Sequence, residues 1–204
     1  MKKIILSGCL SFMAFLFSTA QSVNATEKFE AKVGSVMAYH VKSNGKEYNF
    51  IVTIKKFDAL NEDAIVFDWK MTDPVNKSGT IIIDKDAALN SYALYNYFAS
   101  GEKRLANETS VFIGFMLNLE LGLSSKGDNV KIKVNGAATA EENFTLIDDN
   151  HPFTFTENGK EKTIKTLLLK NNVNGKTITI YNESTNAFIV DMSIGFDISL
   201  QSIN

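Results

Sequence analysis

Residues that carry covalent chemistry or limit the backbone are scarce in this chain of 204 residues, which has one cysteine, two histidines and two prolines. The single cysteine excludes a disulfide-stapled scaffold, and the two prolines exclude proline-rich linkers. A formal charge of -2 removes any general electrostatic reason to bind DNA or RNA, because affinity for phosphates comes from clustered Lys and Arg. At 45% hydrophobic and 22% charged residues, the composition is that of a globular protein and not of a disordered chain.

The amino-terminal segment has the layout of a secretory signal peptide. Two lysines near the start precede residues 4–20, which carry no charge. Small residues at the positions that a signal peptidase recognises place cleavage after Ala20 or after Ala25. We therefore expect a signal peptide over residues 1–25 and a single β-rich domain over residues 26–204, exported to the periplasm or secreted.

Two alternatives for this segment are open. Its apolar run of about 17 residues is at the lower limit for a transmembrane helix. The sequence ending at Cys9 (Leu-Ser-Gly-Cys) resembles the lipobox of bacterial lipoproteins, which predicts a lipid anchor through Cys9. The apolar run continues beyond Cys9, however, whereas in a signal peptide it precedes the cleavage site. Cleavage after residue 25 leaves no transmembrane span and no cysteine, and so excludes disulfides and Cys-ligated zinc in the mature domain.

An Asn-Gly pair at residues 44–45 predicts the first β-hairpin, because a type I′ turn needs positive φ at both of its central residues. With these residues at the turn, Tyr39 lies opposite Phe50 on an apolar face and His40 lies opposite Asn49 on a polar face. Side chains alternate along a strand, so a wrong register would have mixed the two faces.

Two further Asn-Gly pairs, at residues 158–159 and 174–175, predict two more hairpins by the same rule. The expected opposite residues are Phe153 with Ile164 in the former hairpin and Leu169 with Ile180 in the latter.

The longest strand signal is an alternation of apolar and other residues over residues 188–200. A strand of this length exceeds the usual 3 to 10 residues, so we expect it to bend, with Gly195 at the bulge or kink. Shorter alternations over residues 65–71 and 130–134 predict further strands.

One helix is expected over residues 87–98, which contain no Pro, Gly or β-branched residue. Asp84 or Asp86 would cap its start, and the helix would pack against the sheet, where it could act as a plug. The apolar residues 111–123 fit either a buried strand or a short helix. Together these signals predict a mainly β fold: a strongly bent antiparallel sheet or half-open barrel of about eight to eleven strands with one main α-helix packed against it, the alternative being a β-sandwich.

Catalytic motifs are absent: the sequence has no nucleophile elbow, zinc-protease, P-loop, dinucleotide-binding or EF-hand spacing. The densest polar cluster is residues 148–152, where carboxylates beside His151 could orient a base or bind a cation. Its Asp-Asn-Pro composition is typical of an exposed turn, which we expect here. His40 is expected at the surface of its strand. We therefore predict a protein without catalytic residues, metal or cofactor.

Aromatic residues are the remaining candidates for a binding site. Trp69 alternates with apolar neighbours, which predicts core packing, with a sugar-stacking platform as the alternative. The tyrosines of the expected helix either seal the core or line the mouth of a pocket. The candidate pocket lining is Tyr39, Phe50, Phe67, Trp69, Tyr92, Tyr95 and Phe98.

A resemblance covers the layout from Gly34 to Ile203. The two-lysine leader, the hairpin G-S-V-M-A-Y-H-V-K-S-N-G-K-E-Y, the segment Y-N-Y-F-A-S-G-E and the closing strand resemble exported domains of unknown function from Bacteroidota. In outline the chain is also similar to periplasmic lipoprotein carriers and lipocalin-like barrels. This resemblance implies a cavity for an apolar ligand.

The sequence thus predicts an exported, non-catalytic domain that binds a hydrophobic or amphipathic small ligand, or an envelope protein. A carrier that encloses its ligand needs a cavity beyond about 300 Å³. The alternatives are a cell-surface interaction, carbohydrate-binding or assembly protein, which would show one contiguous exposed aromatic patch, and a hydrolase without a recognisable motif. The hydrolase would need His40 or His151 in a cleft beside a carboxylate and a nucleophile.

Overall fold

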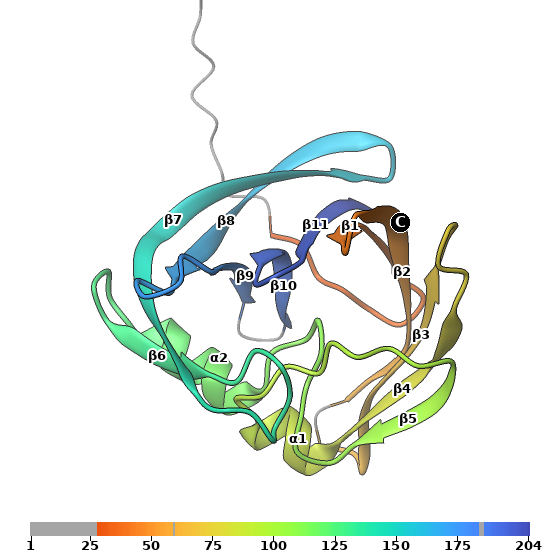
Figure 1. Ribbon diagram of the computed structural model, residues 1–204, viewed down its shortest axis with the longest axis horizontal. Helices are drawn as coiled ribbons and strands as arrows, with labels where there is room; N and C mark the ends of the chain where they lie inside the picture. The colour runs from red at the N-terminus through yellow and green to blue at the C-terminus, as the bar shows by residue number, and fades with distance from the viewer. Residues whose placement is uncertain (1–27, 59, 184–185) are drawn as a thin grey trace, which may run out of the picture.

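The computed structural model describes residues 28–58, 60–183 and 186–204 (Figure 1), so the expected signal peptide and Cys9 lie outside the described residues. The described chain is mainly β, as predicted, and consists of eleven strands and two short helices. The elements are β1 (Val36–Ser43), β2 (Lys46–Phe57), β3 (Asp63–Met71), β4 (Ser78–Asp84), α1 (Lys85–Asn90), β5 (Gly101–Leu105), α2 (Phe115–Leu123), β6 (Asn129–Ile132), β7 (Glu142–Glu157), β8 (Lys160–Lys170), β9 (Thr177–Glu183), β10 (Asn186–Ser193) and β11 (Asp197–Ile203).

All strands belong to one sheet with the order β5-β4-β3-β2-β1-β11-β10-β9-β8-β7-β6. The sheet bends into a partial ring, and the end of β7 pairs with β11, which joins strands β7 to β11 into a loop of strands (Figure 1). The predicted bent sheet is therefore confirmed, although it is mixed: β4 pairs with β5, and β11 with β7, in parallel. The β4 to β5 connection is long enough to cross back, which a parallel pair requires.

The hairpin registers test the sequence pattern directly. In the first hairpin Tyr39 lies opposite Phe50, and in the β7–β8 hairpin Phe153 lies opposite Ile164, both as predicted. In the β8–β9 hairpin the prediction is wrong by two residues, because Ile180 lies opposite Leu167.

The cause of this shift is a wider loop between β8 and β9. The Asn171 N–H donates to the carbonyl of Lys176 over 2.8 Å, and the Asn171 carbonyl accepts from Gly175 N over 2.9 Å. These bonds close the turn at residues 171–176 instead of at the Asn-Gly pair. A shift by two residues keeps every side chain on its predicted face.

The closing alternation forms two strands, not one bent strand. Gly195 has a φ of +111° in the turn between β10 and β11, and Met192 lies opposite Ile198. Residues that lie opposite each other in this hairpin are both even-numbered or both odd-numbered, so the apolar residues stay at even positions on both sides of the turn. A single long strand would show the same alternation, so the sequence pattern does not distinguish the two structures.

The predicted helix over residues 87–98 is wrong beyond its first turn, because α1 ends at Asn90. The following residues are extended. The N–H of Leu94 donates to the carbonyl of Lys133 over 2.8 Å, and that of Tyr95 donates to the carbonyl of Thr109 over 2.6 Å. These bonds to distant segments replace the bonds of a helix. Asp84 occupies the N-cap position but makes no capping bond, and its carboxylate accepts from Arg104 instead.

The ambiguous residues 111–123 contain both of the predicted structures. Their first part is extended and joins β10 ahead of the residues that pair with β11, where the Ile113 N–H donates to the carbonyl of Ala187 over 2.9 Å. Their second part is α2, which buries Leu117 and Leu121. Neither helix of the described chain is long and apolar enough to cross a bilayer.

The prediction of a turn between strands at residues 148–152 is wrong, because this polar cluster is part of β7. The pairing of β7 with β8 shifts register between Leu146 and Asp148 and again between Asp148 and His151. Turn-forming residues suit such bulges, because a bulge needs local hydrogen bonds outside the ladder. Here the carboxylate of Asp148 accepts from Asn150 N over 3.1 Å.

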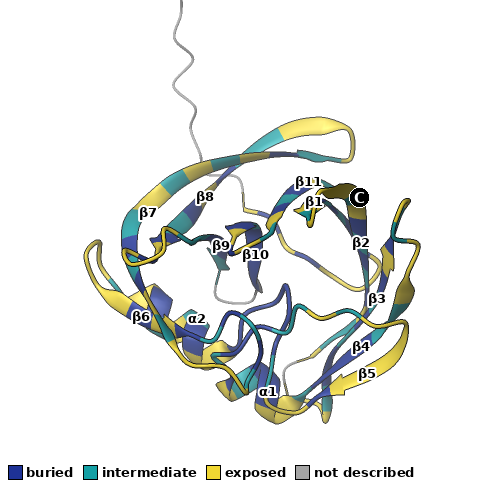
Figure 2. Ribbon diagram, viewed as in Figure 1, coloured by how far each residue is buried: buried dark blue, intermediate teal, exposed yellow. Residues whose placement is uncertain are grey.

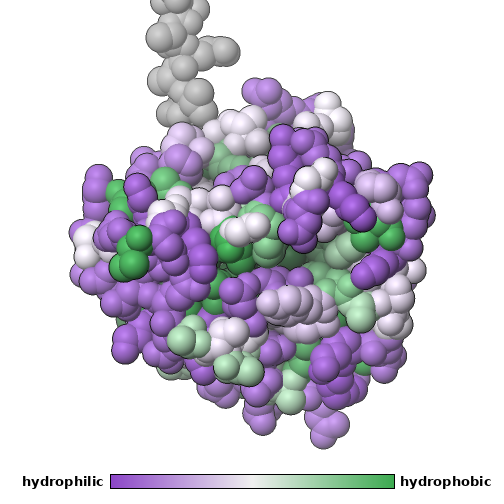
Figure 3. Space-filling model, in the orientation of Figure 1, coloured by the Kyte–Doolittle hydropathy of each residue, from purple (hydrophilic) through white to green (hydrophobic). Residues whose placement is uncertain are grey.

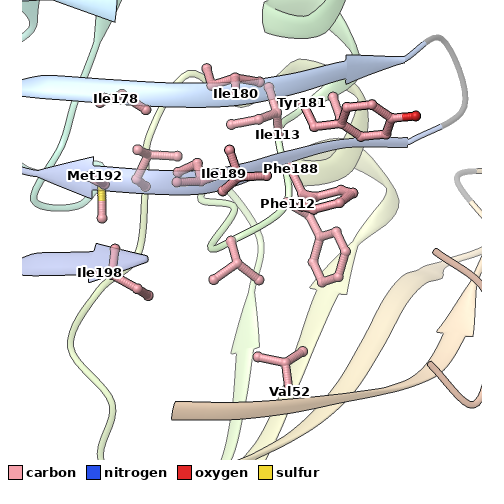
Figure 4. Packing of buried hydrophobic residues seen from close by; sticks show 14 of the residues in the cluster. Val52, Phe112, Ile113, Ile178, Ile180, Tyr181, Phe188, Ile189, Met192 and Ile198 are labelled. Carbon is pink, nitrogen blue, oxygen red and sulfur yellow. The ribbon is translucent and has the colours of Figure 1, made fainter. Parts of the chain in front are cut away.

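The core lies inside the curve of the sheet. Buried residues follow the inner faces of β1 to β4, whereas β5 at the edge is mostly exposed (Figure 2). Phe112, on the extended segment before α2, reaches between β10 and β2 and packs near Phe188 and Val52 (Figure 4). The plug of this sheet is thus an extended chain segment.

Candidate functional site

The candidate site is an apolar cavity of about 100 Å³ between the inner face of the sheet and the segment that follows α1. In the orientation of Figure 1, a hollow with hydrophobic residues is visible near the middle of the molecule (Figure 3). Its lining comes from three places: Val41, Ser43, Tyr48, Phe50 and Met71 on β1 to β3 and their turn; Ile189, Met192, Phe196 and Ile198 around β10 and β11; and Leu94, Tyr95, Asn96, Phe98, Ser110 and Val111 between them.

The cavity exists because residues 91–100, which we call the strap, cross the open side of the sheet without regular secondary structure beyond isolated bridges. Side chains fix its middle. The Asn96 amide donates to the carbonyl of Val134 over 2.8 Å, and the Ser110 hydroxyl donates to the carbonyl of Tyr95 over 3.1 Å. The strap therefore lies over the sheet at a fixed depth and leaves space beneath it.

Three of the seven residues predicted to line a pocket meet at this cavity: Phe50, Tyr95 and Phe98. The inner face of β2 supplies Phe50, and the strap supplies the other two. Their rings are in contact, because the Phe98 centroid lies 4.7 Å from that of Phe50 and 5.5 Å from that of Tyr95.

The other four predicted residues lie elsewhere. Tyr39 is buried in the core, and its hydroxyl donates to the carbonyl of Ile189. Phe67 packs on Phe112, with 5.7 Å between ring centroids. Trp69 lies behind the cavity wall, 5.1 Å from the Phe98 ring, which agrees with the predicted core packing. Tyr92 faces α2 and lines a shallow surface hollow with Leu119 and other residues of that helix.

Sequence reasoning missed most of the opposite wall, formed by Ile189, Met192 and Ile198. These residues stood in the alternation that predicted a strand, and that alternation was the only signal for them. Nothing in the sequence indicated that this strand pair would face Phe50 across a cavity, because the strap that closes the space was expected to be helical.

The electrostatics of the cavity are those of a neutral site. No charged side chain is among its lining residues in the described chain. Burial raises the pKa of Tyr95, and the negative charge of Glu108 adds to the effect. Burial also raises the pKa of Tyr48. Both hydroxyls are therefore neutral at pH 7, and each can donate or accept a hydrogen bond with a bound molecule.

Both histidines lie away from this cavity. His40 lies near Glu47, with 3.3 Å between the ring Nε2 and the carboxylate, and His151 lies 3.4 Å from Asp148. Each is partly exposed, and neither is among the cavity's lining residues. Within the part of the chain that the structure describes, no three or more His, Cys, Asp or Glu side chains are grouped to hold a metal ion.

Comparisons with protein-family models, with curated proteins and with solved structures find no match for this chain. The resemblance to exported Bacteroidota domains is therefore still a prediction from the sequence.

Proposed function

We propose that this protein is an exported, non-catalytic binding domain whose site is the cavity beneath the strap, where an apolar group of a small ligand is held. The observation that carries the proposal is a mostly apolar, uncharged lining with a few hydroxyl and amide groups, such as those of Ser43, Tyr48 and Asn96. Ligand sites have this composition: an apolar lining gives affinity, and a few polar groups orient the ligand.

The size of the cavity limits the ligand. About 100 Å³ is less than the roughly 300 Å³ expected of a carrier that encloses a whole ligand. In this conformation the site holds one apolar group, while the rest of the ligand stays outside. We therefore propose that the protein recognises part of an amphipathic molecule and does not enclose a whole lipid.

The distribution of reactive groups favours binding over hydrolysis. A hydrolytic site needs a nucleophile, a base and a group that orients the base within hydrogen-bond reach of one another. His40 and His151 each have a carboxylate beside them, but both lie outside the apolar cavity. The serines that line the cavity, Ser43 and Ser110, have no imidazole among the other lining residues.

An interaction protein is the second candidate, and one observation favours it. The solvent side of α2 exposes four apolar residues in a stripe: Phe115, Met116, Leu119 and Leu123. This stripe holds one aromatic residue, and most other aromatic residues of the described chain are buried or partly buried. A contiguous exposed aromatic patch, as a carbohydrate-binding surface would show, is therefore not supported.

The test of the proposed function is a titration of the purified domain with the neutral fluorescent probe N-phenyl-1-naphthylamine. Met71 lines the cavity near the end of β3, and Met71→Trp adds bulk there. We expect this variant to weaken binding about tenfold or more. The matched control is Lys70→Trp, because Lys70 is exposed on the other face of the same strand. Equal binding by both variants, or no binding by the wild type, overturns the proposal.

A second measurement concerns the natural ligand and the amino terminus. Native mass spectrometry of the protein purified from its own envelope reports the mature start, any acyl group and any co-purifying molecule. We expect a start after residue 20 or residue 25 and a bound apolar compound. A start at Cys9 that carries lipid would replace the expected soluble export with anchoring.

A further inference from the structure

Phe98 occupies an aromatic corner of the cavity. Its ring centroid lies 4.7 Å from that of Phe50 and 5.1 Å from that of Trp69, and the planes of Phe98 and Trp69 meet at 62°. Both contacts fall in the range of favourable aromatic pairs. Phe50 and Trp69 belong to neighbouring strands of the sheet, so they form a rigid pair that receives a ring from outside the sheet.

The segment that carries Phe98 is weakly held. At one side the Tyr95 N–H donates to the carbonyl of Thr109, and at the other side Gly101 begins β5 and pairs with Gly79. Between these points, residues 97–100 make no backbone hydrogen bond to the described chain. Phe98 itself is only partly buried, whereas Phe50 and Trp69 are each 2% exposed.

We propose that Phe98 is a resident occupant of a ring-sized subsite formed by Phe50 and Trp69, and that the ligand carries an uncharged ring or similar apolar group that displaces the Phe98 side chain. This inference rests on the proposed function and names its ligand class. Access to the subsite is controlled by the strap, because Phe98 must move outward before the ligand can bind fully.

Volume supports the displacement. Engineered apolar cavities of about 150 Å³ bind benzene. The present cavity of about 100 Å³ is smaller than that, and moving a phenyl ring out of the corner adds volume of the same order as the cavity itself. Charge supports the ligand class, because a carboxylate or ammonium among these lining residues would meet no opposite charge.

The site contains its own reporter. Trp69 is the only tryptophan of the chain and is in ring contact with Phe98, so its emission responds when that ring leaves. Two variants of the strap give a matched pair. Phe98→Ala removes the occupant, and Tyr97→Ala removes its neighbour, which is 64% exposed and does not line the cavity.

The experiment titrates N-phenyl-1-naphthylamine into the wild type, Phe98→Ala and Tyr97→Ala, with stopped-flow detection of the probe's fluorescence and, in parallel, of Trp69 emission. We expect Phe98→Ala to bind about tenfold tighter or more, because the ligand no longer has to displace a ring, and Tyr97→Ala to bind like the wild type. In the wild type the observed rate should level off with probe concentration at the rate of Phe98 departure. In Phe98→Ala it should rise linearly.

The outcomes separate this inference from the proposed function. Absence of binding to the wild type overturns the proposed function. If the wild type binds the probe and Phe98→Ala binds it equally well or more weakly, the occupant inference alone is overturned. If Phe98→Ala does not fold, the wild-type kinetics still decide: a rate of probe binding that rises linearly over the whole concentration range overturns displacement of Phe98.

Discussion

The hydroxyl of Tyr39 in β1 donates a hydrogen bond to the main-chain carbonyl of Ile189 in β10 over 3.1 Å. The two strands are separated by β11 in the sheet order, so this bond crosses the inside of the curve. The N–H of the same Ile189 donates to the carbonyl of Val111 over 2.9 Å. One residue of β10 thus connects the first strand with the segment that lines the cavity.

Tyr39→Phe should lower the free energy of unfolding by about 1–2 kcal/mol, because it leaves a buried carbonyl without its side-chain donor. Tyr48→Phe is the control, since Tyr48 is partly buried and its hydroxyl makes no side-chain hydrogen bond within the described residues. Urea unfolding followed by Trp69 fluorescence measures both. Equal stabilities for Tyr39→Phe and the wild type would contradict the structural role of this bond.

Alkaline pH should destabilise the fold through the same residue. Burial raises the pKa of the Tyr39 hydroxyl far above its ordinary value of about 10. A group whose pKa is higher in the folded state stabilises the fold fully below the unfolded pKa, and this contribution is lost as pH rises above it. The free energy of unfolding should therefore fall above about pH 10, and it should fall less steeply for Tyr39→Phe. Parallel pH profiles would rule Tyr39 out as the cause.

Gly79→Ala should detach β5 from the sheet. A Cβ on Gly79 would stand 2.1 Å from the carbonyl oxygen of Gly101, and a backbone atom cannot yield by rotating. We expect destabilisation by several kcal/mol, as for other overpacked or strained backbone sites. Gly122→Ala in α2 is the control, because its nearest neighbour lies at 3.7 Å and alanine favours helix. Thermal unfolding should show a lower melting temperature for Gly79→Ala and an unchanged or higher one for Gly122→Ala.

Asp191→Asn should stabilise the protein at neutral pH. Burial raises the pKa of Asp191, and the negative charge of Asp197 adds to it, although a hydrogen bond from Ser199 works in the opposite direction. A carboxyl with a raised folded pKa favours the fold below its unfolded pKa and loses that contribution as pH rises. The expected gain at pH 7 is less than about 1 kcal/mol, because the site is partly solvated. At pH 3, where Asp191 is protonated in both states, denaturation should show no difference.

Much of the fold follows from local sequence. The faces of β1, β2 and β3 could be predicted because side chains alternate with period two, and the Asn-Gly pair at residues 44–45 fixed the register of the first hairpin. The shift in the β8–β9 hairpin could not be predicted. There the Asn171 backbone closes a wider loop, and a shift of two residues leaves the hydrophobic pattern unchanged.

The candidate site was only partly predictable. Phe50 could be assigned to an inner face from its strand alone, but Tyr95 and Phe98 were assigned to a helix that ends at Asn90. Helical propensity was overruled because the strap finds backbone partners at Thr109 and Lys133, far away in the sequence.

The sequence by itself determined the β class, which faces of the strands are apolar and the scarcity of catalytic residues, because each depends on residue type and on spacing along one strand. Only the tertiary structure decided that β10 and β11 form a hairpin, that the strap is extended and that a cavity lies beneath it. Those features depend on hydrogen bonds and contacts between distant segments. Their cost in chain entropy is offset only when the whole sheet has closed around them.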